Sequence, residues 1–294
     1  NYNISCRNSR GSIRGSKYKK MIKIIKYSNN IGQNKLVSIL DQRRNSNDSD
    51  IELVNKILND VKKNKFQALK KYENKYSKNN EIKPSKKLIS KSIKLLDEKV
   101  KKAIDYAFDR IFKFHKLQIK NFKKIKFKDK YKNKLEYKSV PIDSVGVYVP
   151  GNLPSTLLMN CIPAKIAGVR RIVLATPKIN NILNPAVLYA AKKLGIKEIF
   201  SMGGAQAIAS LAFIQKVNKV VGPGNKYVAE AKRQLSGKVL GTETMYAGAS
   251  EICVLADKNS NLIQVATSLV SQAEHDPDSQ CILVTKDKKI IKKL

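Results

Sequence analysis

Tryptophan is absent from this sequence, and only two of its 294 residues are histidines. The four cysteines, Cys6, Cys161, Cys253 and Cys281, are widely spread, which argues against a metal site built from closely spaced cysteine pairs. The longest uncharged run, residues 144–164, contains three prolines, which argues against a membrane-spanning helix there. No signal-peptide pattern precedes the cysteines, so we expect free thiols and a cytoplasmic protein with no membrane partner.

Acidic residues are also scarce, because 58 lysines and arginines face only 23 aspartates and glutamates, for a net charge of +35. Residues 1–140 carry 39 basic and 13 acidic side chains, against 19 and 10 in residues 141–294. Such a charge is typical of proteins that bind nucleic acid or an anionic membrane. Lysine, asparagine and isoleucine are enriched together while arginine is scarce, as an AT-rich coding sequence would produce. We favour this coding bias over a nucleic-acid partner, because nucleic-acid readers rely on bidentate arginine contacts, and a basic nucleic-acid-binding protein stays the alternative.

The N-terminal part of the chain divides into two regions. Residues 1–20 are polar, basic and without periodicity, and Met21 opens the first orderly segment. We therefore expect 1–20 to be a disordered or non-native extension. Residues 21–140 form a helical region, with a first amphipathic helix around Leu53–Val61 and a second from about Ser85 to Lys120.

Two features of the helical region are expected to be exposed to solvent. His115 lies among lysines on the second helix, which favours a solvated histidine over a metal ligand. The lysine-rich stretch Lys123–Lys138 is typical of a solvated connection that leads into a strand.

From residue 141 to 294, short β-branched runs alternate with helical patterns. The predicted strands are Val145–Val149, Arg171–Ala175, Glu198–Met202, Val217–Val221, Ile252–Ala256 and Cys281–Thr285. The predicted helices are Ser155–Ala167, Pro185–Leu194, Ala205–Phe213, Tyr227–Leu235 and Leu262–Glu274. This alternation predicts an α/β fold with a doubly wound parallel sheet, in which ligands bind at the carboxyl ends of the strands.

Three of the predicted strands end in polar loops that contain glycine. They are Tyr148–Asn152, Gly203–Gln206 and Gly222–Asn225. Tyr227 occupies the third glycine position of a G-x-G-x-x-G fingerprint, so the usual dinucleotide signature is missing. Each loop alone is compatible with an ordinary strand-to-helix turn, whereas three on one sheet edge favour a dinucleotide or phosphate site.

Gln272 and His275 lie three residues apart, at the end of the predicted helix that Pro277 closes. Side chains at this spacing lie on the same face of a helix, about 5–6 Å apart at their Cβ atoms, and can converge on one metal ion. Two ligands do not complete a zinc site. A histidine at the negative end of a helix, beside Asp276 and Asp278, also suits a helix cap, and this stretch alone favours a cap over a metal ligand.

Six blocks of the sequence together resemble histidinol dehydrogenase, in the family's order and close to its spacing. They are Tyr148–Gly151, Pro163–Val169, Gly203–Ala209, Val221–Asn225, Ala247–Glu251 and Gln272–Gln280. The resemblance is tight across roughly residues 145–285 and weaker across 40–140. It implies an NAD-dependent zinc enzyme that oxidises L-histidinol to L-histidine through an aldehyde, as a homodimer, at the end of histidine biosynthesis.

The resemblance also implies roles for individual residues. Tyr148, Gln206 and Asn225 match positions that contact NAD. Ser250 matches a position that contacts substrate. Gln272 and His275 match two zinc ligands that also touch substrate.

The sequence departs from the family pattern in several places. The family's catalytic glutamate–histidine pair, its aspartate zinc ligand and its last histidine ligand all lie beyond the helix that contains His275, and no histidine follows His275 in this chain. Asn152 stands where the family usually has glycine, and Tyr246 and Ala249 replace common prolines. We therefore expect an N-terminal fragment of such an enzyme that is inactive by itself, because it lacks the catalytic base and a full zinc shell.

Overall fold

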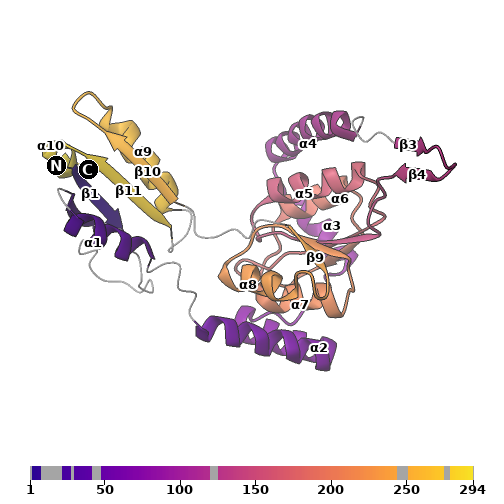
Figure 1. Cartoon of the computed structure of the whole chain (residues 1–294). Coiled ribbons are helices and arrows are strands. Elements are labelled where there is room, and N and C mark those ends of the chain that lie inside the picture. Colours follow the sequence, from indigo (N-terminus) through magenta and orange to yellow (C-terminus); the bar gives the residue numbers. More distant parts are fainter. Residues whose placement is uncertain are drawn as a thin grey trace. The chain divides into compact units, whose positions relative to one another are not determined.

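The computed structural model describes residues 2–7, 22–27, 30–41, 48–119, 125–243, 251–274 and 279–293 (Figure 1). The chain forms two compact units. One comprises Asp48–Tyr246, and the other combines Asn1–Asn47 with Ala247–Leu294. This division differs from the boundaries expected at residues 20 and 140, because the helical segment from Asp48 packs with the strands that follow it, while the two ends of the chain share a sheet.

The unit Asp48–Tyr246 is built on a parallel sheet with the strand order β7-β6-β5-β8-β9 among the described residues. The strands are β5 (Ser144–Tyr148), β6 (Arg171–Ala175), β7 (Glu198–Phe200), β8 (Lys219–Val221) and β9 (Gly241–Thr242). The chain winds outward from β5 in one direction and then from β8 in the other, so the topological switch point lies between these two strands. The predicted doubly wound parallel sheet is confirmed.

Helices cover both faces of this sheet (Figure 1). One face packs against α3 (Lys86–Lys94), α4 (Glu98–Gln118), α5 (Pro154–Ile166) and α6 (Pro185–Lys193). The other packs against α2 (Asp48–Ser77), α7 (Gly204–Phe213) and α8 (Lys226–Leu235). Successive residues of β5 alternate between the two cores, with Val145 and Val147 on the first face and Tyr148 on the second.

The segment predicted as one helix from Ser85 to Lys120 is two helices, α3 and α4. Ser85 caps the first, since its Oγ accepts a hydrogen bond from the Leu88 N–H at 3.1 Å. Asp97 caps the second, since its Oδ1 accepts from the Lys99 N–H at 2.6 Å. The prediction of one continuous helix is wrong because an aspartate that bonds a backbone N–H ahead of it starts a new helix.

The first predicted helix, around Leu53–Val61, is confirmed within α2, but α2 bends sharply at Lys65, whose backbone has φ 48° and ψ −125°. The Asp60 carboxylate receives hydrogen bonds from the Tyr72 hydroxyl at 2.9 Å and the Lys71 ammonium at 3.1 Å. Residues 12 apart on a straight helix would be separated by about 18 Å, so the bend brings these side chains together. Hydrogen bonds from Asn64, Lys71 and Tyr72 lower the pKa of Asp60 to about 2.

The predicted solvated connection Lys123–Lys138 contains an antiparallel ribbon of β3 (Ile125–Lys128) and β4 (Lys134–Tyr137). Every residue of both strands is exposed, which agrees with the expected solvation. The turn forms because Asp129 Oδ1 accepts hydrogen bonds from the N–H groups of Tyr131 and Asn133, both at 2.8 Å.

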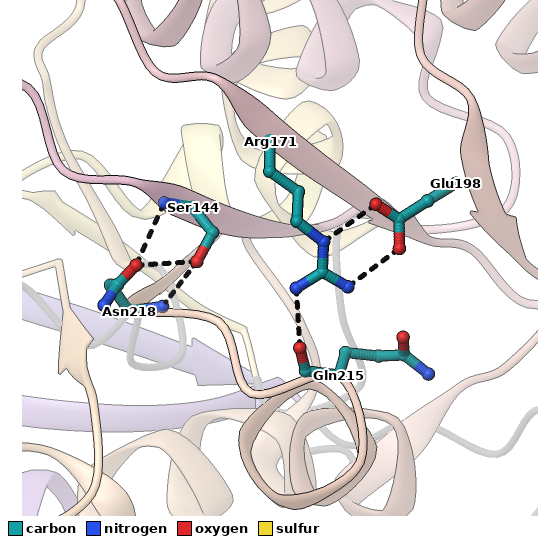
Figure 2. Close-up of polar contacts among 5 residues, drawn as sticks. All are labelled: Ser144, Arg171, Glu198, Gln215 and Asn218. Atoms are coloured by element: carbon teal, nitrogen blue, oxygen red, sulfur yellow. Dashed lines mark hydrogen bonds and ion pairs between the residues drawn. The ribbon is translucent and has the colours of Figure 1, made fainter.

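Two polar clusters fasten the amino-terminal edge of the parallel sheet (Figure 2). The Arg171 guanidinium on β6 donates two hydrogen bonds to Glu198 on β7, both at 2.8 Å, and a third to the Gln215 carbonyl at 2.7 Å. The Asn218 Oδ1 accepts from the Ser144 N–H and hydroxyl at 3.0 and 2.7 Å. These contacts fix the strand ends opposite the edge where the predicted loops lie.

The other unit contains a sheet with the strand order β10-β11-β1-β2. Its strands are β10 (Glu251–Ala256), β11 (Gln280–Thr285), β1 (Tyr2–Arg7) and β2 (Ile22–Tyr27), and its helices are α1 (Asn30–Asp41), α9 (Leu262–Ala273) and α10 (Lys288–Lys293). Strands β10 and β11 run parallel, as predicted, and β1 pairs antiparallel to β11. The disorder expected for residues 1–20 is wrong for Tyr2–Arg7, because β11 and β2 supply backbone partners that a local pattern cannot reveal.

Among the described residues, no helix combines the length and the apolar character that a membrane crossing requires.

Candidate functional site at the carboxyl edge of the parallel sheet

The loops that follow β5, β7 and β8 meet at the carboxyl edge of the parallel sheet. The Gly204 N–H, after β7, donates to the Tyr148 hydroxyl at 3.4 Å. A Cβ added to Gly222, after β8, would lie 1.9 Å from the Tyr148 carbonyl oxygen. The structure therefore brings together the three glycine-containing loops that the sequence singled out, at the switch point where doubly wound sheets bind ligands.

Tyr148 is the last residue of β5 and is almost completely buried. Its ring belongs to the apolar core shared with α2, α7 and α8. Burial raises the pKa of its phenol to about 12, and the Glu73 charge adds to that rise. The side chain is therefore neutral at physiological pH, and its hydroxyl acts through hydrogen bonds.

Gln206 lies in the first turn of α7, and a carboxylate that the sequence did not single out holds its amide. The Glu73 Oε1 atom accepts one hydrogen bond from Gln206 Nε2 and another from the Gly203 N–H, both at 2.9 Å. Glu73 comes from α2 and is completely buried. Burial raises the pKa of this carboxyl group, although the bonds from Gly203 and Gln206 favour its charged form.

A second contact joins the segment after α2 to the same loop. The Asn79 Nδ2 atom donates to the Ser201 carbonyl at 2.6 Å, and the Ser201 N–H donates to the Ile82 carbonyl at 2.6 Å. Asn79 and Ser201 are both buried. The residues that support the loop after β7 thus come from the predicted helical region, and only tertiary contacts identify them.

Asn225 is exposed and caps α8, since its Oδ1 accepts a hydrogen bond from the Val228 N–H at 3.2 Å. The preceding Gly222 has φ +112°, a conformation that side-chain-bearing residues rarely adopt. Lys232, about two turns beyond Asn225 on α8, is buried and donates to the Gly222 carbonyl at 2.8 Å. Its ammonium also pairs with Glu243.

The residues predicted to bind substrate and metal belong to the other unit. Ser250 and His275 lie outside the described residues. Gln272 lies in the last turn of α9, which ends at Ala273, and its Nε2 is 3.5 Å from the Ser279 hydroxyl oxygen. The predicted pairing of Gln272 with His275 therefore stays a prediction.

The two implied cofactors fit the described residues differently. The edge around Tyr148 and Gly222 offers polar groups and a glycine that lets two loops approach closely, as a dinucleotide site requires. In the part of the chain that the structure describes, no group of three or more histidine, cysteine, aspartate or glutamate side chains could hold a metal ion. Gln272 alone does not form a zinc shell.

Comparison with known proteins identifies the family. The histidinol dehydrogenase family profile matches residues 40–294. Over 281 residues the chain is 52% identical to histidinol dehydrogenase of Pelagibacter ubique (strain HTCC1062), covering 93% of this chain and 65% of that protein. It is 44% identical over 242 residues to the Bacillus subtilis (strain 168) enzyme, covering 79% of this chain and 56% of that protein.

A solved structure agrees with these relatives. The crystal structure of histidinol dehydrogenase from Elizabethkingia anophelis superposes with a TM-score of 0.70 and 38% identity. The match covers 82% of this chain and 57% of that one. This chain thus spans less than two thirds of the length of the relatives named here, and it belongs to the histidinol dehydrogenase family.

Proposed function

We propose that the protein oxidises L-histidinol to L-histidine through L-histidinaldehyde, with NAD as the oxidant, in histidine biosynthesis. Family membership supports this reaction. The observation that carries the proposal is the convergence of the loops after β5, β7 and β8 on one edge of the sheet. Such an edge, at a topological switch point, is where doubly wound sheets bind nucleotides.

In this proposal Tyr148, Gln206 and Asn225 contact the dinucleotide. NAD supplies the hydride acceptor, and the protein supplies its binding and orientation. The neutral Tyr148 hydroxyl and the exposed Asn225 amide offer hydrogen bonds without charge. Gly222 allows its loop to lie directly against the backbone of β5, which keeps the edge compact beside the bound cofactor.

Ser250, Gln272 and His275 remain the proposed contacts to substrate, and Gln272 and His275 the proposed contacts to zinc. A homodimer and a cytoplasmic location are part of the same proposal, and neither nucleic acid nor membrane is a proposed partner. The base that accepts the hydroxyl proton is not assigned to a described residue.

NADH formation from L-histidinol and NAD, in the presence of zinc, tests the proposal. We expect the full-length protein to form NADH and the His275→Ala variant of that protein to lose this activity. The matched control is His115→Ala, because His115 is the other histidine and contacts Gln118 on the surface of α4. Full activity in the full-length His275→Ala variant would contradict the assignment of His275, and no NADH from the unchanged full-length protein would contradict the proposed reaction.

The net charge of +35 keeps nucleic-acid binding as the second candidate. Binding driven by lysine contacts to phosphate would weaken steeply as salt concentration rises. We expect no binding to duplex DNA or single-stranded RNA at about 0.15 M salt. Retained binding under that condition would favour the second candidate.

A further inference from the structure

We propose that Glu73 is a positioning residue for the cofactor, which fixes the Gly203–Gly204 turn and orients the Gln206 amide so that its oxygen faces the ligand. This inference rests on the proposed NAD-dependent function. It assigns a role to a residue of α2, outside the parallel sheet and outside the loops that resemble the family's signature blocks.

The geometry places one carboxylate oxygen between two groups of the loop after β7. The Glu73 Oε1 atom receives the Gly203 N–H and the Gln206 Nε2, both at 2.9 Å. The Gly204 N–H is directed to Tyr148 instead, at 3.4 Å. Glu73 therefore holds the turn directly, while Tyr148 holds the adjacent amide.

The carboxylate also decides which end of the Gln206 amide is available. The Glu73 Oε1 atom accepts a hydrogen bond from the Gly203 N–H, and Gln206 directs its NH₂ group toward the same oxygen. Its Oε1 then lies on the side of Gly204, 2.9 Å from where a Cβ of that glycine would be. The Gln206 side chain is buried, and the end of its amide that does not bond Glu73 is an acceptor. That oxygen suits a hydrogen-bond donor such as a ribose hydroxyl or a carboxamide N–H.

The same contacts make this loop unsuitable for the cofactor's phosphates. Helix N-termini bind phosphate through free backbone N–H groups and positive dipole charge. At α7 the Gly203 and Gly204 N–H groups already have acceptors, and a carboxylate lies at the helix start. A phosphate here would meet the Glu73 charge and an amide oxygen, so the loop after β7 receives a hydroxyl- or amide-bearing part of the dinucleotide.

A glutamate at this position is costly, which suggests a role beyond packing. Glu73 is completely buried, and its Oε2 accepts no hydrogen bond from the described residues. Burial of a carboxylate disfavours its charged form, and the pKa of Glu73 is raised accordingly. An apolar side chain of similar size would fit the core between α2 and α7 without that cost.

The test measures NAD binding to the full chain by isothermal titration calorimetry. We expect Glu73→Ala to weaken NAD binding by about tenfold, the effect of losing a hydrogen bond to a charged group. Glu73→Gln keeps an acceptor for Gly203 and Gln206 and should bind within about threefold of wild type. If Glu73→Ala does not fold, Glu73→Met preserves the volume, lacks the acceptor and should show the same loss.

Val61→Ala is the matched control for a purely structural effect, because Val61 is a buried residue of the same helix without polar contacts. It should lower the unfolding temperature and leave NAD affinity unchanged. A double-mutant cycle of Glu73→Met with Gln206→Ala, measured by NAD affinity, adds a second readout. If Glu73 acts through Gln206, Glu73→Met should weaken binding far less in the Gln206→Ala background than in wild type.

The outcomes separate the two proposals. Wild-type NAD binding that Glu73→Ala and Glu73→Met leave intact would overturn the role of Glu73 and leave the proposed function standing. Equal losses of NAD affinity in Val61→Ala and Glu73→Met would also overturn the role of Glu73. Strictly additive losses of NAD affinity in the double-mutant cycle would do the same. No NAD binding by the wild-type chain would count against the proposed function itself, and the role of Glu73 would fall with it.

Discussion

The Lys232 ammonium lies 2.8 Å from the Gly222 carbonyl oxygen, and it pairs at the same time with the Glu243 carboxylate. Lys232 is almost completely buried, whereas the Glu243 side chain keeps 30% of its exposure. One cation on α8 thus joins the loop after β8 to the residue that follows β9.

Replacing Lys232 with methionine should lower the free energy of unfolding by about 2–3 kcal/mol, because the Glu243 carboxylate and the Gly222 carbonyl would lose their shared donor. Urea denaturation measures this change. The double variant Lys232→Met/Glu243→Gln should recover part of the loss, since no unpaired charge remains. An unchanged denaturation midpoint in Lys232→Met would show that the buried pair contributes no stability.

Gly222→Ala should be far more destabilising than the same change at Gly237. The new Cβ at Gly222 would lie 1.9 Å from the Tyr148 carbonyl oxygen, whereas at Gly237 it would meet no atom within 4 Å. Both glycines have positive φ, so Gly237→Ala isolates the conformational cost of about 1–2 kcal/mol. We expect Gly222→Ala to lower the free energy of unfolding, measured by urea denaturation, by more than about 3 kcal/mol. Equal losses would contradict the close approach of the two loops.

Stability should fall as pH rises through the titration of Glu73. Its pKa is raised by burial above the usual value of 4.5, so the folded state binds more protons than the unfolded state between 4.5 and the raised pKa. The stability that the protonated Glu73 contributes is present below pH 4.5 and is lost as the pH rises through the raised pKa of the folded state. The slope of stability against pH should correspond to about one proton per molecule. Thermal unfolding measured from pH 4 to pH 8 checks this slope. Glu73→Gln should remove this component, and an identical pH profile in that variant would contradict its origin in Glu73.

Asp60 should have the opposite pH dependence. Its pKa is lowered from 3.8 to about 2, so its contribution is present above pH 3.8 and lost as pH falls through about 2. Asp60→Asn should lower the free energy of unfolding by about 1 kcal/mol at neutral pH. This loss is small because the side chain is partly exposed and solvent screens its interactions. Urea denaturation at pH 7 checks this value. Glu98→Gln is the control, since the exposed Glu98–Lys101 pair should contribute less than about 0.5 kcal/mol.

Apart from the two-residue strand β9 and the helix α10, the strands and helices after residue 140 could be predicted because their signals are local. Pro154 and Pro185 occupy the first positions of α5 and α6, and Gly203 and Gly222 mark the loops after β7 and β8. The positions of Tyr148, Gln206 and Asn225 at strand ends and helix starts followed from the same pattern. The break between α3 and α4 was missed because a continuous apolar stripe outweighed the single capping signal of Asp97.

The sequence by itself determined the main strand–helix alternation after residue 140, the doubly wound character of the parallel sheet and the edge where a ligand would bind, since periodicity and glycine or proline placement act between near neighbours. Only the tertiary structure decided which of the 23 acidic side chains supports that edge. Glu73 and Gln206 are 133 residues apart, and nothing local distinguishes Glu73 from the exposed carboxylates of the helical region. Likewise β1 exists because β11 and β2 complete its backbone hydrogen bonds, and such partners are created only when distant segments pack together.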